Sequence, residues 1–148
     1  MVGETAEDFI LKDQKGDEFR LYDNLDKMVL LVFYPKDSSF VCTMQMNNYW
    51  DNIELFEKHN IRVVPINPED ASSHSGFCNS LGADFRILID SGKEVSRRFG
   101  ALNFIGLNKR KVVLIGTERK ILYEKAVFTA FYRKADFLIR TFEKLKII

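Results

Sequence analysis

One cysteine, Cys42, stands where its side chain could act as a nucleophile. It follows the apolar run 28–34, which ends at Pro35, and it precedes a helical pattern of apolar residues that includes Met46. At the start of a helix, free backbone N–H groups and the helix dipole favour an anion such as a thiolate. A free cysteine is only a few per cent thiolate at pH 7, so a lowered pKa can raise the thiolate fraction by roughly 30-fold at most. This gain is modest, because the nucleophilicity of a thiolate falls as its pKa falls. A catalyst at Cys42 therefore also needs donors that stabilise charge on its substrate.

The cysteine count bears on the compartment of the protein. The chain has 148 residues and two cysteines, Cys42 and Cys78. Two cysteines are too few for a secreted disulfide scaffold, and the acidic residues 1–8 contain no apolar signal core. We therefore expect a cytoplasmic protein whose cysteines are reactive rather than structural.

Charge and composition argue against several other classes of protein. Lys and Arg number 22 and Asp and Glu 21, so the net charge of +1 suits neither a nucleic-acid module nor a polybasic membrane anchor. The apolar run 28–34 is too short to span a bilayer. His74 and Cys78 are four residues apart, but only one other histidine is present, so we expect no metal site. Without a glycine-rich phosphate loop, we also expect no cofactor.

The hydrophobic pattern predicts alternating strands and helices. An α/β class follows, with a thioredoxin-like fold in which a central mixed β-sheet carries helices on both faces. We expect a single domain over residues 1–148. One helix is expected from the apolar pattern that includes Met46 and Phe56 and stops at Asn60. Three further helices are expected at 70–81, 91–99 and 135–145. Strands are expected at 28–34, 61–66, 85–89, 111–115 and 121–127, the last two forming a hairpin.

The residues around Cys42 resemble the peroxiredoxin signature. In that signature a proline is followed after three residues by Thr or Ser, and after two more by Cys; Pro35, Ser39 and Cys42 occupy these places. Other segments are similar to the bacterioferritin-comigratory, or Q-type, branch: 33–37, 42–45, 73–77, 88–95 and 110–115.

This resemblance implies a thiol-dependent peroxidase that reduces hydrogen peroxide and organic hydroperoxides. The Cys42 thiolate would attack the O–O bond and become a sulfenic acid. Ser39 would hydrogen-bond the peroxide, and Pro35 would shield the site from water. Arg110 matches the family's arginine and would stabilise the thiolate and the departing oxygen. The N–H groups of Val41 and Cys42 would complete the set of donors.

The resemblance also implies a role for Cys78. Some Q-type peroxiredoxins carry a resolving cysteine on the helix after the second strand, where this chain has Cys78. Others carry it five residues after the peroxidatic cysteine, where this chain has Asn47. A Cys42–Cys78 disulfide within one chain, reduced by a thioredoxin-type dithiol, is therefore implied. A packing role for Cys78, beside Phe77 and Leu81, stays open.

The thirteen phenylalanines bear on the oligomeric state. Phe40-Val41-Cys42 is similar to the typical 2-Cys branch, since Q-type members usually carry Pro-Gly before the cysteine. That branch uses its matching Phe in dimer contacts. The resemblance therefore implies a monomer, or a homodimer that forms through Phe40 and nearby aromatics of the active face, among which we consider Phe104 and Phe128.

Two other functions fit the sequence less well. A thioredoxin-like disulfide oxidoreductase would carry Cys-x-x-Cys and a proline before the hairpin strand. Position 45 is Gln, and the three prolines, at 35, 65 and 68, leave none before Lys111. A non-catalytic binding protein of this fold is expected to have lost Cys42, Ser39 or Arg110. The sequence retains all three, which favours the peroxidase.

Overall fold

A five-stranded sheet forms the centre of the molecule, for which a computed structural model describes all residues 1–148. The strand order is β5-β4-β3-β6-β7. β3 pairs in parallel with β4 and antiparallel with β6, so the sheet is mixed, as predicted. The strands are β3 (Met28–Phe33), β4 (Ile61–Asn67), β5 (Leu88–Ile89), β6 (Arg110–Ile115) and β7 (Ile121–Val127).

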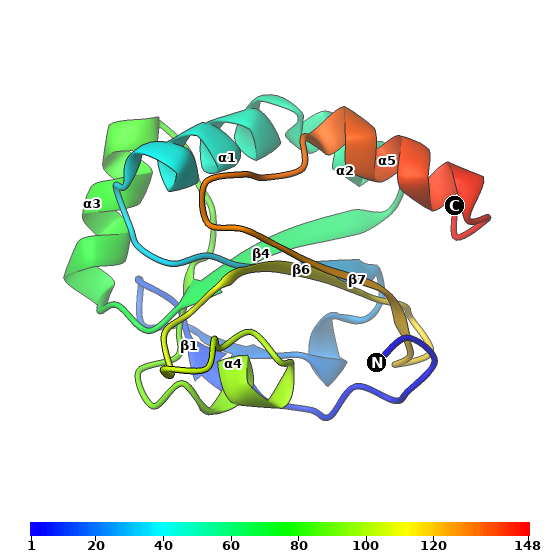
Figure 1. The fold of residues 1–148 in the computed structure, drawn as a ribbon, viewed down its shortest axis with the longest axis horizontal. Helices are drawn as coiled ribbons and strands as arrows, with labels where there is room; N and C mark the ends of the chain where they lie inside the picture. Colours follow the sequence, from blue (N-terminus) through cyan, green and yellow to red (C-terminus); the bar gives the residue numbers. More distant parts are fainter.

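Two layers cover this sheet (Figure 1). Alternate residues of β3 enter two separate cores, Leu30 and Val32 on one face and Val29 and Leu31 on the other, because side chains along a strand alternate between faces. One layer contains α1 (Phe40–Asp51), α2 (Ile53–Lys58), α3 (Ala71–Leu81) and α5 (Ala135–Lys144). The other contains α4 (Glu94–Arg98), a hairpin of β1 (Ile10–Lys12) and β2 (Glu18–Arg20), and the 3₁₀ helix η1 (Tyr22–Asn24).

Three elements differ from their predicted extents. The helix expected over 91–99 is only Glu94–Arg98, because Lys93 before it adopts a left-handed φ of 57°. The helix expected to run to Asn60 is two helices, because Asn52 leaves helical geometry at φ −110° and ψ 19° and its side-chain amide bonds the carbonyl of Asn48 at 2.8 Å. The strand expected over 85–89 is only Leu88–Ile89. The side chain of Gln14 instead bonds the carbonyl of Phe85 and the N–H of Ile87. The pattern also gave no sign of the β1–β2 hairpin.

The sheet brings the chemically interesting segments to one edge. β3 ends at Phe33, and the loop that follows leads into α1 at Phe40. Because β6 runs antiparallel to β3 and Lys111 pairs with Phe33, the first residue of β6, Arg110, lies beside the end of β3. Ligands in open α/β sheets bind at the carboxyl ends of strands. None of the helices has the length and apolar character that crossing a bilayer requires.

Candidate active site

The start of α1 surrounds Cys42 with free donors. Cys42 is the third residue of the helix and is fully buried. Ser39 is the N-cap, and its carbonyl accepts the first helical hydrogen bond from the Thr43 N–H at 2.8 Å. The N–H groups of residues 40–42 precede that bond and stay outside the helical ladder. This end of α1 can therefore stabilise negative charge on the sulfur or on an oxygen beside it.

Arg110 supplies a buried positive charge at the same place. Its Nη1 donates to Cys42 Sγ at 3.3 Å and to Gln45 Oε1 at 2.7 Å. Its Nε and Nη2 donate to the Thr129 carbonyl at 3.3 and 2.8 Å. Arg110 is only 2% exposed, and no carboxylate lies within 4.0 Å of it. Because an unpaired buried cation is costly, Arg110 can stabilise negative charge that develops beside it during a reaction.

Gln45 is a site residue that the sequence analysis did not single out. Its Nε2 donates to the Tyr49 hydroxyl at 3.2 Å, and that hydroxyl donates to the Arg133 carbonyl at 2.7 Å. Burial raises the pKa of Tyr49 well above its usual range, so the phenol remains a donor. This chain of bonds turns the amide oxygen of Gln45 towards Arg110. Its position three residues after Cys42, on the same helix face, was the available signal.

Pro35 and Ser39 occupy the loop that precedes the helix. Both are partly buried. The hydroxyl of Ser39 donates to the Lys36 carbonyl at 3.0 Å and keeps its lone pairs free to accept. The structure therefore brings Cys42 and Arg110 into contact, and it places Ser39 in the adjoining loop without a hydrogen bond to either.

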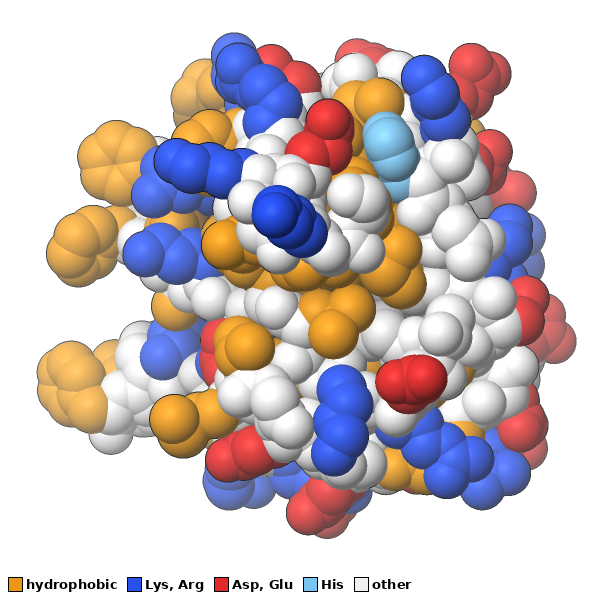
Figure 2. Space-filling model, turned by 90° about the vertical axis from the view of Figure 1, so that its right-hand side faces the viewer, with side chains coloured by type: hydrophobic (Ala, Val, Ile, Leu, Met, Phe, Trp, Pro, Cys, Tyr) orange, Lys and Arg blue, Asp and Glu red, His pale blue; other side chains and the backbone are white.

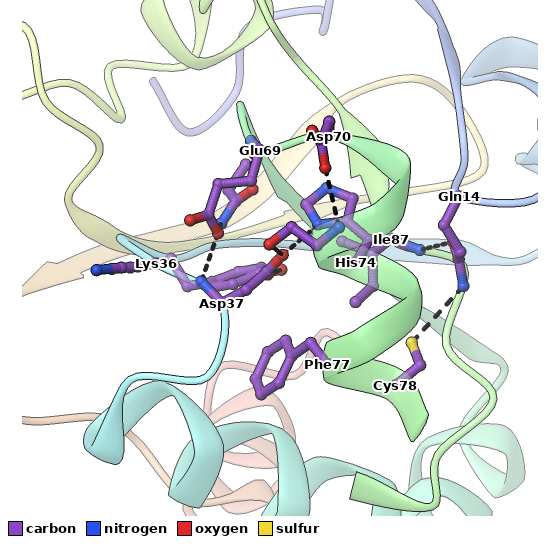
Figure 3. Close-up of polar contacts among 12 residues, drawn as sticks. Gln14, Lys36, Asp37, Glu69, Asp70, His74, Phe77, Cys78 and Ile87 are labelled. Carbon is purple, nitrogen blue, oxygen red and sulfur yellow. Dashed lines mark hydrogen bonds and ion pairs between the residues drawn. The ribbon is translucent and has the colours of Figure 1, made fainter. Parts of the chain in front are cut away.

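Cys78 lies on α3, in the same core cluster as Cys42, but has polar partners of its own. Its Sγ donates to the Phe85 carbonyl at 3.6 Å. It also accepts from Gln14 Nε2 at 3.6 Å (Figure 3). The two cysteines are not bonded to each other. Burial, together with the nearby charge of Asp37, raises the pKa of Cys78 to about 11. Cys78 is therefore a protonated, weakly nucleophilic thiol while α3 is intact.

Comparison with known proteins is consistent with this geometry. A model of the AhpC/TSA family matches residues 2–124. The chain belongs to this family, and it is a peroxiredoxin. It is 38% identical over 100 residues to a putative peroxiredoxin bcp of Helicobacter pylori, which covers 68% of this chain and 66% of the relative. It is 36% identical over 98 residues to chloroplastic peroxiredoxin Q of Arabidopsis thaliana, covering 66% and 45%. The alignments thus span from 45% to 66% of these relatives' lengths.

Solved structures confirm the predicted fold of this peroxiredoxin. Peroxidoxin BcpB from Mycobacterium tuberculosis superposes with a TM-score of 0.83 at 27% identity, over 99% of this chain and 97% of that one. A cysteine-to-serine mutant of PrxQ from Xylella fastidiosa, 20% identical, superposes with a TM-score of 0.85 over 99% and 96%. Together with the sequence relatives, they confirm the resemblance to the Q-type branch and the thioredoxin-like fold.

The buried state of Cys78 predicts how its alkylation depends on pH. In the reduced native peroxiredoxin, we expect iodoacetamide to leave Cys78 almost unmodified at pH 8 and to modify it faster as the pH rises towards about 11, because the thiolate is the reacting form. In urea, Cys78 should react as an ordinary thiol with a pKa near 8.5. Peptide mass mapping separates Cys78 from Cys42. Equal labelling in the native and unfolded states at pH 8 would contradict the burial.

A second polar cluster involves residues 34–39, the loop between β3 and α1, which we call the active-site loop (Figure 3). The carboxylate of Asp37 accepts hydrogen bonds from the hydroxyls of Tyr34 and Ser73 and from Nδ1 of His74. Burial by itself would raise the pKa of Asp37, but the hydrogen bonds from His74, Tyr34 and Ser73 outweigh it and hold the pKa below its ordinary value. His74, for which the sequence analysis expected no metal-binding role, thus bonds Asp37.

Proposed function

We propose that this peroxiredoxin is a thiol-dependent peroxidase that reduces hydrogen peroxide and organic hydroperoxides at Cys42. The observation that supports this most is the Arg110 guanidinium, which is buried, lacks a carboxylate partner and donates to Cys42 Sγ at 3.3 Å. Attack on a peroxide moves negative charge from the sulfur to the departing oxygen. A cation beside the sulfur, with the free N–H groups of α1, can stabilise both positions of that charge.

The proposed reaction conserves atoms and electrons. The Cys42 thiolate attacks the terminal oxygen of the peroxide, the O–O bond breaks, and the sulfur is oxidised to a sulfenic acid. The other oxygen leaves as hydroxide or alkoxide and takes up a proton to become water or an alcohol. Ser39 positions the peroxide through its hydroxyl, and Pro35 keeps water from the sulfur. Consumption of hydrogen peroxide and cumene hydroperoxide in step with oxidation of a thioredoxin tests this activity.

Cys78 is proposed to resolve the sulfenic acid. Its thiol attacks the Cys42 sulfur, water leaves, and a disulfide forms that a thioredoxin-type dithiol reduces with two electrons. Because each sulfur is buried with separate partners, the first turn of α1 and the turns of α3 around Cys78 must unwind for the bridge to form. Gly76, within α3, lowers the cost of that unwinding.

The resolving role predicts the behaviour of Cys78→Ser. We expect this variant to react once with peroxide at the wild-type rate and then to stop as the Cys42 sulfenic acid, which further peroxide overoxidises. After one equivalent of peroxide, mass spectrometry should show the loss of two hydrogens in the wild type and the gain of one oxygen in the variant. Normal turnover of Cys78→Ser with thioredoxin would instead assign resolution to an external thiol.

Residues 1–148 are proposed to form a single domain. This domain is also proposed to form a homodimer through exposed aromatic side chains of the active face. Phe40, Phe104 and Phe128 are 80%, 98% and 81% exposed. Phe104 and Phe128 line one groove of about 780 Å³ beside Lys125 and Arg133. Figure 2 shows large hydrophobic side chains that project from one edge of the molecule, with lysine and arginine side chains between them. Exposed apolar patches of this kind mark interaction surfaces. Light scattering, which gives the molar mass in solution, distinguishes the homodimer from a monomer.

A further inference from the structure

A buried clamp holds the active-site loop to the start of α3 (Figure 3). The Asp37 carboxylate accepts from Ser73 Oγ at 2.7 Å and from His74 Nδ1 at 2.6 Å, both in the first turns of α3. In the opposite direction, the backbone N–H of Asp37 donates to Glu69 Oε2 at 2.6 Å. Glu69 is itself held by Asn67, whose amide donates to the same oxygen at 3.2 Å. Side chain and backbone of one loop residue are thus both tied to the segment that leads into α3.

The centre of this clamp is the buried Asp37–His74 pair, which takes no part in the proposed reaction with peroxide. The side chains of Asp37 and His74 are 3% and 0% exposed, and neither has a hydrogen bond to Cys42 or Arg110. His74 Nε2 lies 3.2 Å from the Leu88 carbonyl, which can only accept, so Nε2 carries a proton. Removing one member of such a buried pair is strongly destabilising.

The pair joins the two segments that must move for a disulfide to form. Asp37 lies three residues before α1, and Cys78 lies one helical turn after His74. The hydroxyl of Ser39, nearer to α1, bonds only within the loop, to Lys36. The position of the loop therefore depends on the first turns of α3. Coupling between two sites is reciprocal, so unwinding of α3 loosens the loop and opening of the loop loosens α3.

We propose that the Asp37–His74 pair is a latch that couples opening of the active-site loop to unwinding of α3, and that it thereby sets the rate of resolution by Cys78 against overoxidation of Cys42. Asp37 and His74 are positioning residues. The closed latch keeps the loop assembled for peroxide and keeps Cys78 packed away. The kinetic part rests on the proposed function, whereas the coupling rests on the contacts alone.

Hydrogen exchange of the reduced protein tests the coupling without any peroxide. In Asp37→Asn we expect amide exchange in residues 34–48 and 70–82 to rise together by roughly tenfold or more, while β3 and β6 stay protected. The matched control is Glu124→Gln. It removes the ion pair between Glu124 and Lys111, whose atoms lie 2.7 Å apart outside the clamp, and amide exchange in both segments should stay slow. Acceleration of only one segment, or of the central strands equally, overturns the latch.

A second variant and a double mutant separate a latch from two independent structural effects. His74→Gln removes the ring but leaves an amide donor near Asp37, and it gives the same test if Asp37→Asn does not fold. When two residues act as one unit, the double variant opens little more than either single variant. Each single variant raises the amide exchange rate by some factor. If the factor in the double variant equals the product of the two single factors, the residues act independently and the proposal is overturned.

Stopped-flow fluorescence tests the kinetic part, because the only tryptophan reports on this region. The ring of Trp50 on α1 packs edge-to-face against the ring of Phe85, with 5.2 Å between the ring centroids. The Phe85 carbonyl accepts a hydrogen bond from Cys78. In His74→Gln the closed form should still predominate, so we expect the peroxide phase to stay within about twofold of wild type. The small open fraction should rise, so we expect the resolution phase to be roughly tenfold faster, with less overoxidation. Unchanged resolution overturns this role. If the wild type shows no peroxide phase, the proposed function fails, and exchange alone decides the latch.

Discussion

Replacement of Cys42 by serine is expected to abolish peroxide turnover and to leave the fold intact. A serine hydroxyl does not ionise near pH 7 and cannot form a sulfenic acid, so both the nucleophile and the intermediate are lost. Serine is close to cysteine in size, and Arg110 keeps its bonds to Gln45 and to the Thr129 carbonyl. Burial of a hydroxyl in place of the sulfur is expected to lower the free energy of unfolding by about 1–3 kcal/mol.

Peroxide consumption with a thioredoxin system measures the effect of Cys42→Ser, and circular dichroism with thermal unfolding shows whether the fold persists. Cys78→Ser is the matched control, because it changes the other buried cysteine in the same way and should still consume one equivalent of peroxide. Thiol-dependent peroxide reduction that remains in folded Cys42→Ser would remove Cys42 from the mechanism and turn attention to Cys78.

Arg110→Ala is expected to slow the attack on peroxide by about 10²–10³, the usual effect of losing one donor to a developing oxyanion. The structure suggests an effect at least this large, because the guanidinium is the only charged group bonded to Cys42 Sγ and its orientation is set by Gln45 on one side and Thr129 on the other. The rate should be measured in single turnover, at a pH high enough to ionise Cys42 in both proteins. The difference in rate between the two proteins then measures the loss of transition-state stabilisation alone, because both contain the same fraction of thiolate.

Two further variants sharpen the interpretation of Arg110→Ala. Arg110→Lys keeps the charge but lacks the planar fork that reaches Cys42, Gln45 and the Thr129 carbonyl together, so it should restore only part of the rate. Ser39→Ala should slow attack without altering its pH dependence, because the hydroxyl bonds Lys36 and not the sulfur. If Arg110→Ala reaches the wild-type rate at high pH, Arg110 serves only the thiolate and does not donate to the departing oxygen.

Features that depend on neighbours along the chain could be predicted from the sequence. The apolar run before Pro35 predicted the buried central strand, and the spacing of Pro35, Ser39 and Cys42 predicted a nucleophile in the first turn of the next helix. Asp70 and Gly82 bound α3 as their types indicate: Asp70 accepts from the Ser73 N–H, and Gly82 adopts a φ of 64°. Burial pattern and backbone preference are local properties, and local properties are visible in a sequence.

The tertiary structure decided which distant residues meet. Arg110 was expected at the site only through resemblance, and it reaches Cys42 because β6 runs antiparallel beside β3. The bond between Asp37 and His74 has no local signature, since the two residues are 37 apart and meet only when α3 packs against the loop. Gln14 ends the strand expected from 85 by the same kind of long-range contact. Such contacts depend on strand register and helix packing, which periodicity within one segment does not encode.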